Sequence, residues 1–192
     1  MNRLLVIFIS MATVFPVFAQ ERKHEIGIGI GVGTTSEIVD IFSDVISSAI
    51  TAGMYSSNTT YTGGFNLWYK YNLTRSIGLG GTFVYEHARS DAYSDGTKTG
   101  EFNKNYYTLV AESSFRYLIS GKFSLYGILG AGATLYDQKY KATNGSDSDN
   151  DLVSFNFQIS PIAIRYGDRL GFFIELGFGY KGIISAGLYT RF

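Results

Sequence analysis

Alternating apolar and polar positions are the feature of this chain that most restricts its fold. Residues 24–34 show the pattern simply, because Ile26, Ile28, Ile30 and Val32 alternate with glycines. Eight segments alternate in this way or carry dense aromatic residues: 24–34, 60–72, 76–88, 105–119, 122–137, 152–166, 170–181 and 183–192. A period of two is that of a β-strand, whose successive side chains point to opposite faces. The sequence therefore predicts an all-β protein.

The two faces of these segments differ in chemistry. In 152–166, for example, Val153 and Phe155 alternate with Ser154 and Asn156. A soluble sheet would also alternate, but its apolar face would be a packed interior of branched aliphatic residues. Here the apolar face is rich in aromatic residues, and the other face carries Gly, Ser, amides and charges. This pattern is typical of strands with lipid outside and a polar lumen inside.

The connections between the segments fall into two sets. Those after the second, fourth and sixth segments are short: 73–75, 120–121 and 167–169. Those after the first, third and fifth are long and polar, and they are expected to be surface loops: 35–59, 89–104 and 138–151. Because unpaired strand edges cannot face lipid, the sheet has to close. We predict an eight-stranded antiparallel up-and-down transmembrane β-barrel with periplasmic turns and extracellular loops.

The first 19 residues predict export. Arg3 precedes the apolar run 4–9, and Val17-Phe18-Ala19 fits a cleavage site, which is the pattern of a secretory signal peptide. We therefore expect a signal peptide at 1–19 and one barrel domain at 20–192. The formal net charge of zero gives no bias toward nucleic acid, and the absence of Cys excludes disulfides and thiolate metal sites.

The last strand carries a resemblance to known families. The chain ends in Leu188-Tyr189-Thr190-Arg191-Phe192. With the signal peptide and the eight alternating segments, this end resembles the small bacterial outer-membrane β-barrels: OmpX, the OmpA barrel domain and the Bacteroidetes-type group. The resemblance implies an outer-membrane location among lipid and lipopolysaccharide. It also implies that Leu188 and Phe192 act as the signal read by the barrel-assembly machinery.

The polar face supplies the candidate site residues. They are Lys70, Glu86, Glu112, Arg116, Arg165, Glu175, Lys181 and Arg191. An eight-stranded barrel is just wide enough for side chains to fill it, and buried charges must pair. We expect a structural ion-pair network with Glu112, Arg116 and Glu175 near mid-depth. The alternative is a narrow ion path in which Glu112 and Glu175 are selective carboxylates.

Two further local features bear on the fold. Pro161 reverses the alternation in its segment, which predicts a bulge because Pro cannot donate to the strand ladder. Aromatic residues near the expected strand ends predict interfacial girdles. They are Trp68, Tyr69, Tyr71, Tyr106, Tyr107, Tyr117, Tyr126, Tyr136, Tyr166, Tyr180 and Tyr189.

Two of the long connections carry motifs. The range 34–54 carries apolar residues at helical spacing and begins with a capping box at Thr34 to Glu37. These features predict a short amphipathic helix. The helix would pack over the rim, bind lipid or dock a partner. Asp147, Asp149 and Asp151 form a weak Ca²⁺ candidate, because the Gly and closing Glu of an EF-hand are missing. We expect no cofactor.

The sequence favours a non-catalytic outer-membrane protein with an envelope-structural role, or with a surface-interaction role through the three long loops. The first alternative is a narrow porin-like pore. The second is a lipid-modifying barrel enzyme, for which His87 and Ser90 stand one place too far apart to match the His-x-Ser pair of barrel-type lipid A deacylases.

Overall fold

The computed structural model describes residues 23–40, 54–94, 97–143 and 148–192. The expected signal peptide lies outside these residues. Nine strands follow in chain order: β1 (His24–Val32), β2 (Met54–Tyr61), β3 (Gly64–Asn72), β4 (Ile77–Ser94), β5 (Thr97–Ser120), β6 (Phe123–Ala142), β7 (Ser148–Gly167), β8 (Leu170–Gly179) and β9 (Ile184–Arg191). One helical turn and a half, at 35–40, follows β1. Within the described residues, no helix is both long and apolar enough to cross a bilayer.

Eight of the strands close into a ring. Every pairing is antiparallel, in the order β4-β3-β1-β9-β8-β7-β6-β5, and β4 pairs with β5 to close the circle. Neighbours along the chain are neighbours in the ring, which is the up-and-down topology that was predicted. The seam joins β1 to β9, since His24 and Phe192 exchange backbone hydrogen bonds of 3.1 and 3.0 Å.

The ninth strand corrects the expected second segment. Residues 60–72 do not form one strand, because the strand is interrupted at Thr62-Gly63, where Gly63 has a φ of +77°. A positive φ suits Gly and interrupts the ladder. β3 then continues in the ring between β1 and β4, whereas β2 pairs only with the outer part of β4, from Met54 opposite Ser94 to Tyr61 opposite Ala88.

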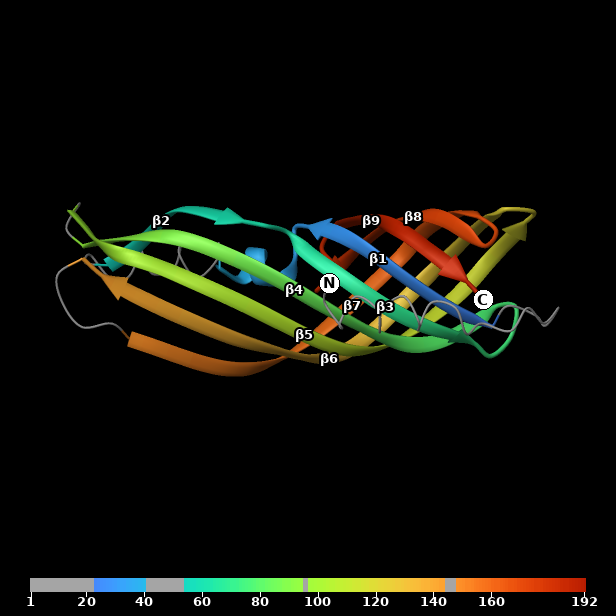
Figure 1. Cartoon of the computed structure of the whole chain (residues 1–192), viewed down its shortest axis with the longest axis horizontal. Coiled ribbons are helices and arrows are strands. Elements are labelled where there is room, and N and C mark those ends of the chain that lie inside the picture. Colours follow the sequence, from blue (N-terminus) through green and yellow to red (C-terminus); the bar gives the residue numbers. More distant parts are fainter. Residues whose placement is uncertain (1–22, 41–53, 95–96, 144–147) are drawn as a thin grey trace, which may run out of the picture.

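The wall of the barrel has two heights. β4, β5, β6 and β7 have 18, 24, 20 and 20 residues, whereas β1, β3, β8 and β9 have only 8 to 10. The four long strands project beyond the ring with β2 beside them (Figure 1). The prediction of loops over 89–104 and 138–151 was therefore wrong for most of both ranges. Outside lipid, a ladder continues with polar side chains on it, because its backbone hydrogen bonds do not depend on an apolar face.

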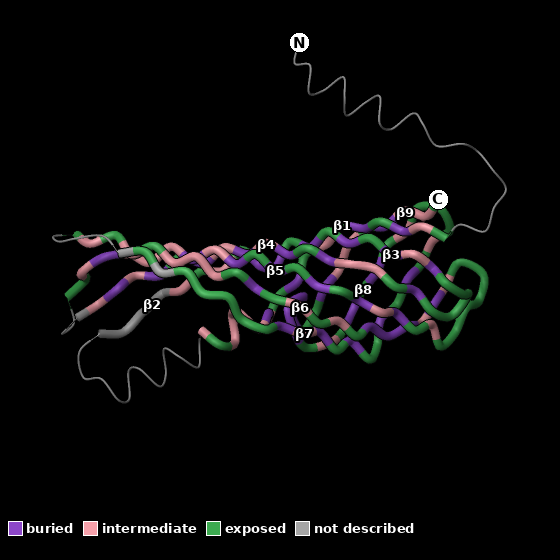
Figure 2. Tube along the Cα trace, turned by 90° about the horizontal axis from the view of Figure 1, so that it is seen from below, coloured by how far each residue is buried: buried purple, intermediate pink, exposed green. Residues whose placement is uncertain are grey.

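The exterior of the ring is apolar. Every ring strand contributes exposed apolar residues, such as Ile28, Phe83, Leu109 and Leu188. The lumen-facing positions between them are buried (Figure 2). A large exposed apolar surface on a closed barrel is the surface that hydrocarbon covers.

Strand β7 has the expected bulge. Its pairing with β6 shifts between Ser160 and Ala163, and its pairing with β8 shifts between Ile159 and Ile162. On either side of Pro161 the outward residues are therefore Ile159 and Ile162. This change of phase carries Arg165 to the lumen.

The prediction of aromatic girdles was wrong for six residues. Trp68, Tyr106, Tyr126, Tyr180 and Tyr189 are buried inside the barrel, and Tyr136 lies on the same inner face, opposite Tyr106. Aromatic residues favour strands on either face, so an aromatic side chain alone does not say whether it meets lipid or lumen. Glycines on β1 make room for the largest ring, since a Cβ on Gly27 would lie 2.3 Å from Trp68.

Candidate functional site

Most of the charged side chains of the lumen form two clusters. The first, called the lower cluster because it lies toward the expected periplasmic end, surrounds Glu25. Its carboxylate forms ion pairs with Arg116 at 2.6 Å, with Arg191 at 2.9 Å and with Arg165. Asn72 donates a further hydrogen bond of 3.0 Å to it. Three guanidinium groups from β5, β7 and β9 therefore converge on one acid from β1, which ties four walls of the barrel together.

The upper cluster lies around Lys181, in the connection between β8 and β9. Its ammonium lies 2.8 Å from Glu112 and 3.1 Å from Glu175. Lys70 lies 3.1 Å from Glu112 on the other side. The hydroxyl groups of Tyr180 and Tyr126 donate hydrogen bonds of 2.6 and 2.8 Å to Glu112 and Glu175. All of these side chains are buried, so each charge is held by partners instead of water.

Glu86 stands apart from both clusters. Its two carboxylate oxygens lie 2.9 and 2.8 Å from the Thr34 hydroxyl, which shares its one proton between them, just before the helical turn. Glu86 thus links the first extracellular connection to the rim of the barrel.

Large side chains fill the space between the two clusters. The Arg165 guanidinium lies over three rings, with 4.2 Å to the centroid of Tyr126, 4.9 Å to Trp68 and 5.3 Å to Tyr189. Phe173 packs edge-on against Trp68 with centroids 5.7 Å apart. A guanidinium enclosed by aromatic rings gains cation–π attraction, and the rings occupy the middle of the lumen.

Glu25, at the centre of the lower cluster, was not among the candidate residues. It lies in phase with Gly27, Gly29 and Gly31 on the lumen face of β1. The alternation of that strand was the signal that could have found it.

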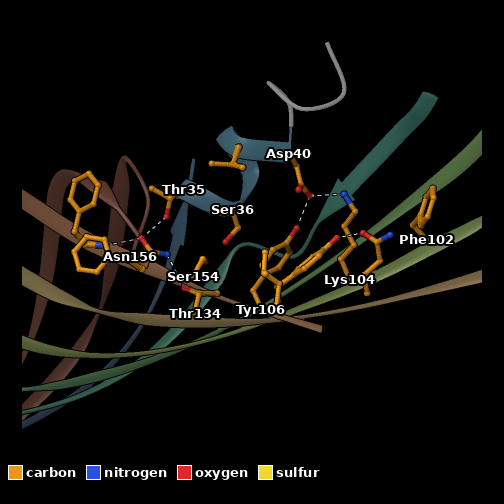
Figure 3. Close-up of a pocket in the computed structure, with 15 residues that line it drawn as sticks. Thr35, Ser36, Asp40, Phe102, Lys104, Tyr106, Thr134, Ser154 and Asn156 are labelled. Carbon is orange, nitrogen blue, oxygen red and sulfur yellow. Dashed lines mark hydrogen bonds and ion pairs between the residues drawn. The ribbon is translucent and has the colours of Figure 1, made fainter. Parts of the chain in front are cut away.

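The mouth of the barrel holds a cavity of about 610 Å³. One wall is the helical turn 35–40, where the predicted capping box forms in part. The Glu37 N–H donates 3.2 Å to Thr34 Oγ1, but Glu37 Oε2 accepts 2.9 Å from the N–H of Gly33, one residue before the capping Thr34. Beyond residue 40 the expected helix lies outside the described residues. The facing wall is the inner face of β5, β6 and β7 (Figure 3).

Asp40 anchors the helical turn to that wall. It lies 2.9 Å from Lys104 Nζ and accepts a hydrogen bond of 2.6 Å from the Tyr106 hydroxyl. Thr35 Oγ1 donates 2.9 Å to Asn156, whose amide donates 2.9 Å to Thr134 (Figure 3). The cavity is therefore bordered by a neutralised ion pair at one end and by an amide and hydroxyl chain at the other.

The outer parts of β4 to β7 together with β2 form a sheet that projects beyond the ring, called the projecting sheet, and its inner face carries paired side chains. Across β5 and β6, Phe102 pairs with Tyr140 and Tyr106 pairs with Tyr136. The ring centroids lie 5.0 and 5.1 Å apart in the two pairs. Between these aromatic pairs stands Lys104, opposite Gln138.

The outer face of the same sheet carries exposed charges. Lys98 lies 2.7 Å from Asp91 and 3.0 Å from Glu101, which also pairs with Arg89. The hydrogen bonds from Arg89 and then Lys98 hold the pKa of Glu101 below its usual value. The outer face is thus charged and internally paired, in contrast to the aromatic inner face.

The acidic and histidine candidates are not assembled into sites. Asp149 and Asp151 are exposed along β7, while Asp147 lies outside the described residues, and among the described residues no group of three or more His, Cys, Asp or Glu could hold a metal. On the outer face of β4, His87 Nδ1 lies 3.0 Å from Asn105 Oδ1, whereas Ser90 is buried on the inner face. Opposite faces of one strand cannot give a nucleophile and its base.

A closed eight-stranded ring with a lipid-facing apolar exterior and an ion-paired interior defines the class: this is an integral outer-membrane β-barrel of the small type. No family model matches the chain. Over 98 residues it is 36% identical to the attachment invasion locus protein of Yersinia enterocolitica, covering 48% of this chain and 54% of that protein. The chain thus matches about half the length of this relative.

Solved structures of the Yersinia pestis attachment invasion locus protein, Ail, are also similar. The complex with the heparin analogue sucrose octasulfate has a TM-score of 0.45 and 18% identity, covering 88% of this chain and 96% of that one. The structure in a phospholipid bilayer nanodisc has a TM-score of 0.40 and 18% identity, covering 90% and 100%. None of these relatives supports the Bacteroidetes-type resemblance.

Proposed function

We propose that the chain is a non-catalytic outer-membrane protein that binds partners outside the cell through the projecting sheet, defined as the outer parts of β4 to β7 together with β2. The observation that carries this proposal is the free edge of β7. Above Gln158, which pairs with Gly179, β7 has β6 on one side and no described strand on the other.

The free edge has an identifiable set of backbone donors and acceptors. The Phe157 carbonyl accepts 3.1 Å from the Tyr180 N–H on the β8 side. Because backbone groups alternate between the two sides of a strand, those of Phe155, Val153 and Asp151 point to the same, open side. An exposed row of this kind is a template for strand addition by a partner.

Because side chains fill the lumen, the proposal does not include the pore alternative. Eight strands leave little room, and Trp68, Tyr126 and Arg165 occupy the middle of the barrel. The separation of His87 from Ser90 speaks against the lipid-modifying enzyme. Among the described residues, the projecting sheet extends beyond the barrel and is available for an external role.

The relatives suggest what kind of contact this is. By analogy with the attachment invasion locus protein, the partner is a component of a host surface. The heparin analogue is bound in the structure of a relative. We do not extend polyanion binding to this chain, because Arg89 and Lys98 on its outer face already pair with acidic side chains. In this proposal the projecting sheet recognises protein backbone more than polyanion charge.

The surroundings and assembly of the barrel follow the same proposal. Outer-membrane lipid and lipopolysaccharide cover the apolar exterior. Leu188 and Phe192, both exposed on the outer side of β9 and at its end, serve as the signal for the barrel-assembly machinery, which pairs with the edge of β9 before β1 closes the ring.

The test is adherence of Escherichia coli displaying the chain to fixed cultured epithelial cells. Val153→Pro removes one N–H from the free edge without removing a bond to β6, since Pro is tolerated where the N–H faces solvent. We expect this variant to lose adherence and the matched Val153→Thr variant to keep it. Heat-modifiable gel migration verifies that both barrels are folded. Adherence of Val153→Pro at the level of the unaltered chain would refute the proposal.

A further inference from the structure

We propose that the cavity at the mouth of the barrel binds a neutral oligosaccharide. The proposal rests on the surface-binding role above and adds a ligand class and a place for it. At about 610 Å³, the cavity falls within the range of small-molecule sites, which is about 300–1,000 Å³. Such sites combine a mostly apolar lining with a few placed polar groups.

The charges around the cavity favour an uncharged ligand. Among the described residues that line the cavity, Lys104 and Asp40 are the charged ones, and they neutralise each other at 2.9 Å. Asp40 is also held by the Tyr106 hydroxyl at 2.6 Å. A charged ligand would have to break this pair or enter without a countercharge, and both are costly in a partly buried site.

The aromatic residues favour a ligand with flat apolar faces. Phe102, Tyr106 and Tyr136 line the cavity. They belong to the pairs Phe102–Tyr140 and Tyr106–Tyr136 on the inner face of β5 and β6, whose centroids lie 5.0 and 5.1 Å apart. Their positions differ by four residues along each strand, which is about 13 Å. The C–H faces of sugar rings pack on aromatic rings, and a spacing of this size exceeds a single sugar. The ligand is therefore an oligosaccharide.

The polar lining separates a saccharide from a lipid chain. Thr35, Asn156 and Thr134 form one connected chain of hydroxyl and amide groups along the cavity wall, and Ser154 and Gln138 also line it. Burying these groups under an acyl chain would cost their hydration without replacing it. Sugar hydroxyl groups both donate and accept hydrogen bonds, so they match such a wall.

The experiment is saturation-transfer NMR on the full mature chain in phosphatidylcholine nanodiscs free of lipopolysaccharide. The neutral probes are maltohexaose and chitopentaose, and the charged probe is sucrose octasulfate. We expect saturation transfer to at least one neutral probe, with glucose binding more weakly than its oligomer. Absence of transfer to both neutral probes, or tighter binding of sucrose octasulfate, would overturn the proposal.

Three variants locate the site. Phe102→Leu removes one ring from the lining of the cavity, and we expect about tenfold weaker binding. Phe102→Tyr keeps the ring, and it should bind as the unaltered chain does. Tyr107→Leu removes a ring of the Tyr85–Tyr107 pair on the opposite face and should also leave binding unchanged. Equal binding by Phe102→Leu and the unaltered chain contradicts the assignment.

The saccharide has two sources, which the same measurement separates. In nanodiscs that contain lipopolysaccharide, loss of the transfer signal identifies the saccharide of the protein's own membrane as the occupant, and retention identifies a free glycan. Either result supports the site. Failure of this proposal leaves the proposed function intact, because the Val153→Pro variant tests the edge of β7 without touching the aromatic pairs.

Discussion

Lys181 Nζ lies 2.8 Å from Glu112 Oε1, although Lys181 enters from the short extracellular connection between β8 and β9 and Glu112 stands on β5. Both side chains are fully buried. The connection therefore folds inward and closes the barrel with a charge. The same ammonium lies 3.1 Å from Glu175, so Lys181 joins the two carboxylates of the upper cluster. Arg116, which was expected beside Glu112 and Glu175, belongs to the lower cluster instead, where it pairs with Glu25.

Removing Lys181 should destabilise the barrel. Lys181→Met leaves Glu175 without its ammonium and Glu112 with Lys70 alone. Loss of one member of a buried ion pair costs about 3–5 kcal/mol. Urea titration followed by gel migration measures this loss, with the exposed Lys139→Met as the control. A change no larger than that of Lys139→Met would show that the network does not stabilise the fold.

Neutralising Glu25 should have a comparable effect through the lower cluster. Glu25→Gln keeps the size of the side chain but leaves Arg116, Arg165 and Arg191 without their shared acid. We expect a loss of about 3–5 kcal/mol in the free energy of unfolding. Glu101→Gln is the matched control on the exposed outer face, where screening makes ion pairs weak. Equal stability of the two variants would argue against the central role of Glu25.

Gly31 should tolerate no side chain. A Cβ at this position would lie 1.7 Å from the Lys181 carbonyl oxygen, whereas a Cβ on Gly81 would meet only the Val110 carbonyl oxygen, at 3.3 Å. Overpacking of this kind costs about 1–3 kcal/mol. Gly31→Ala should therefore unfold at lower urea than Gly81→Ala. The reverse order would mean that the inward connection is not held against β1.

The lumen should not conduct. Because Trp68, Tyr126 and Arg165 fill its middle, planar-bilayer recordings of the refolded chain should show no large, steady conductance. A Trp68→Ala variant removes the largest ring and provides the comparison. Steady channels in the unaltered chain would restore the porin-like alternative.

Phe192 should matter more for assembly in cells than for folding in detergent. Its ring stacks on His24 with centroids 5.6 Å apart, and 42% of the residue is exposed. If Phe192 is read by the assembly machinery, Phe192→Ala should lower the amount of folded barrel in the outer membrane while refolding in detergent stays efficient. An equal defect in both assays would mean that Phe192 only anchors the strand.

The alternation of single residues allowed the ring to be predicted. Ile26, Ile28 and Ile30 assign one face of β1, and the phase change at Pro161 was read correctly from the same rule. The eight charged candidates also lie on the predicted lumen side. A period of two is a local property of the chain, so it is present in the sequence itself.

Only the tertiary structure decided how high each strand rises and which faces meet. The strands continue through most of 89–104 and 138–151 because their backbones hydrogen-bond to neighbouring strands. Polar side chains neither cause nor prevent this backbone pairing, so the sequence pattern did not predict it. Three arginines from β5, β7 and β9 meet at Glu25 on β1. Tyr106 on β5 likewise bonds to Asp40 in the helical turn after β1. Both sets of contacts join residues that are far apart in the sequence. Such pairings arise from the closure of the ring, which no local pattern encodes.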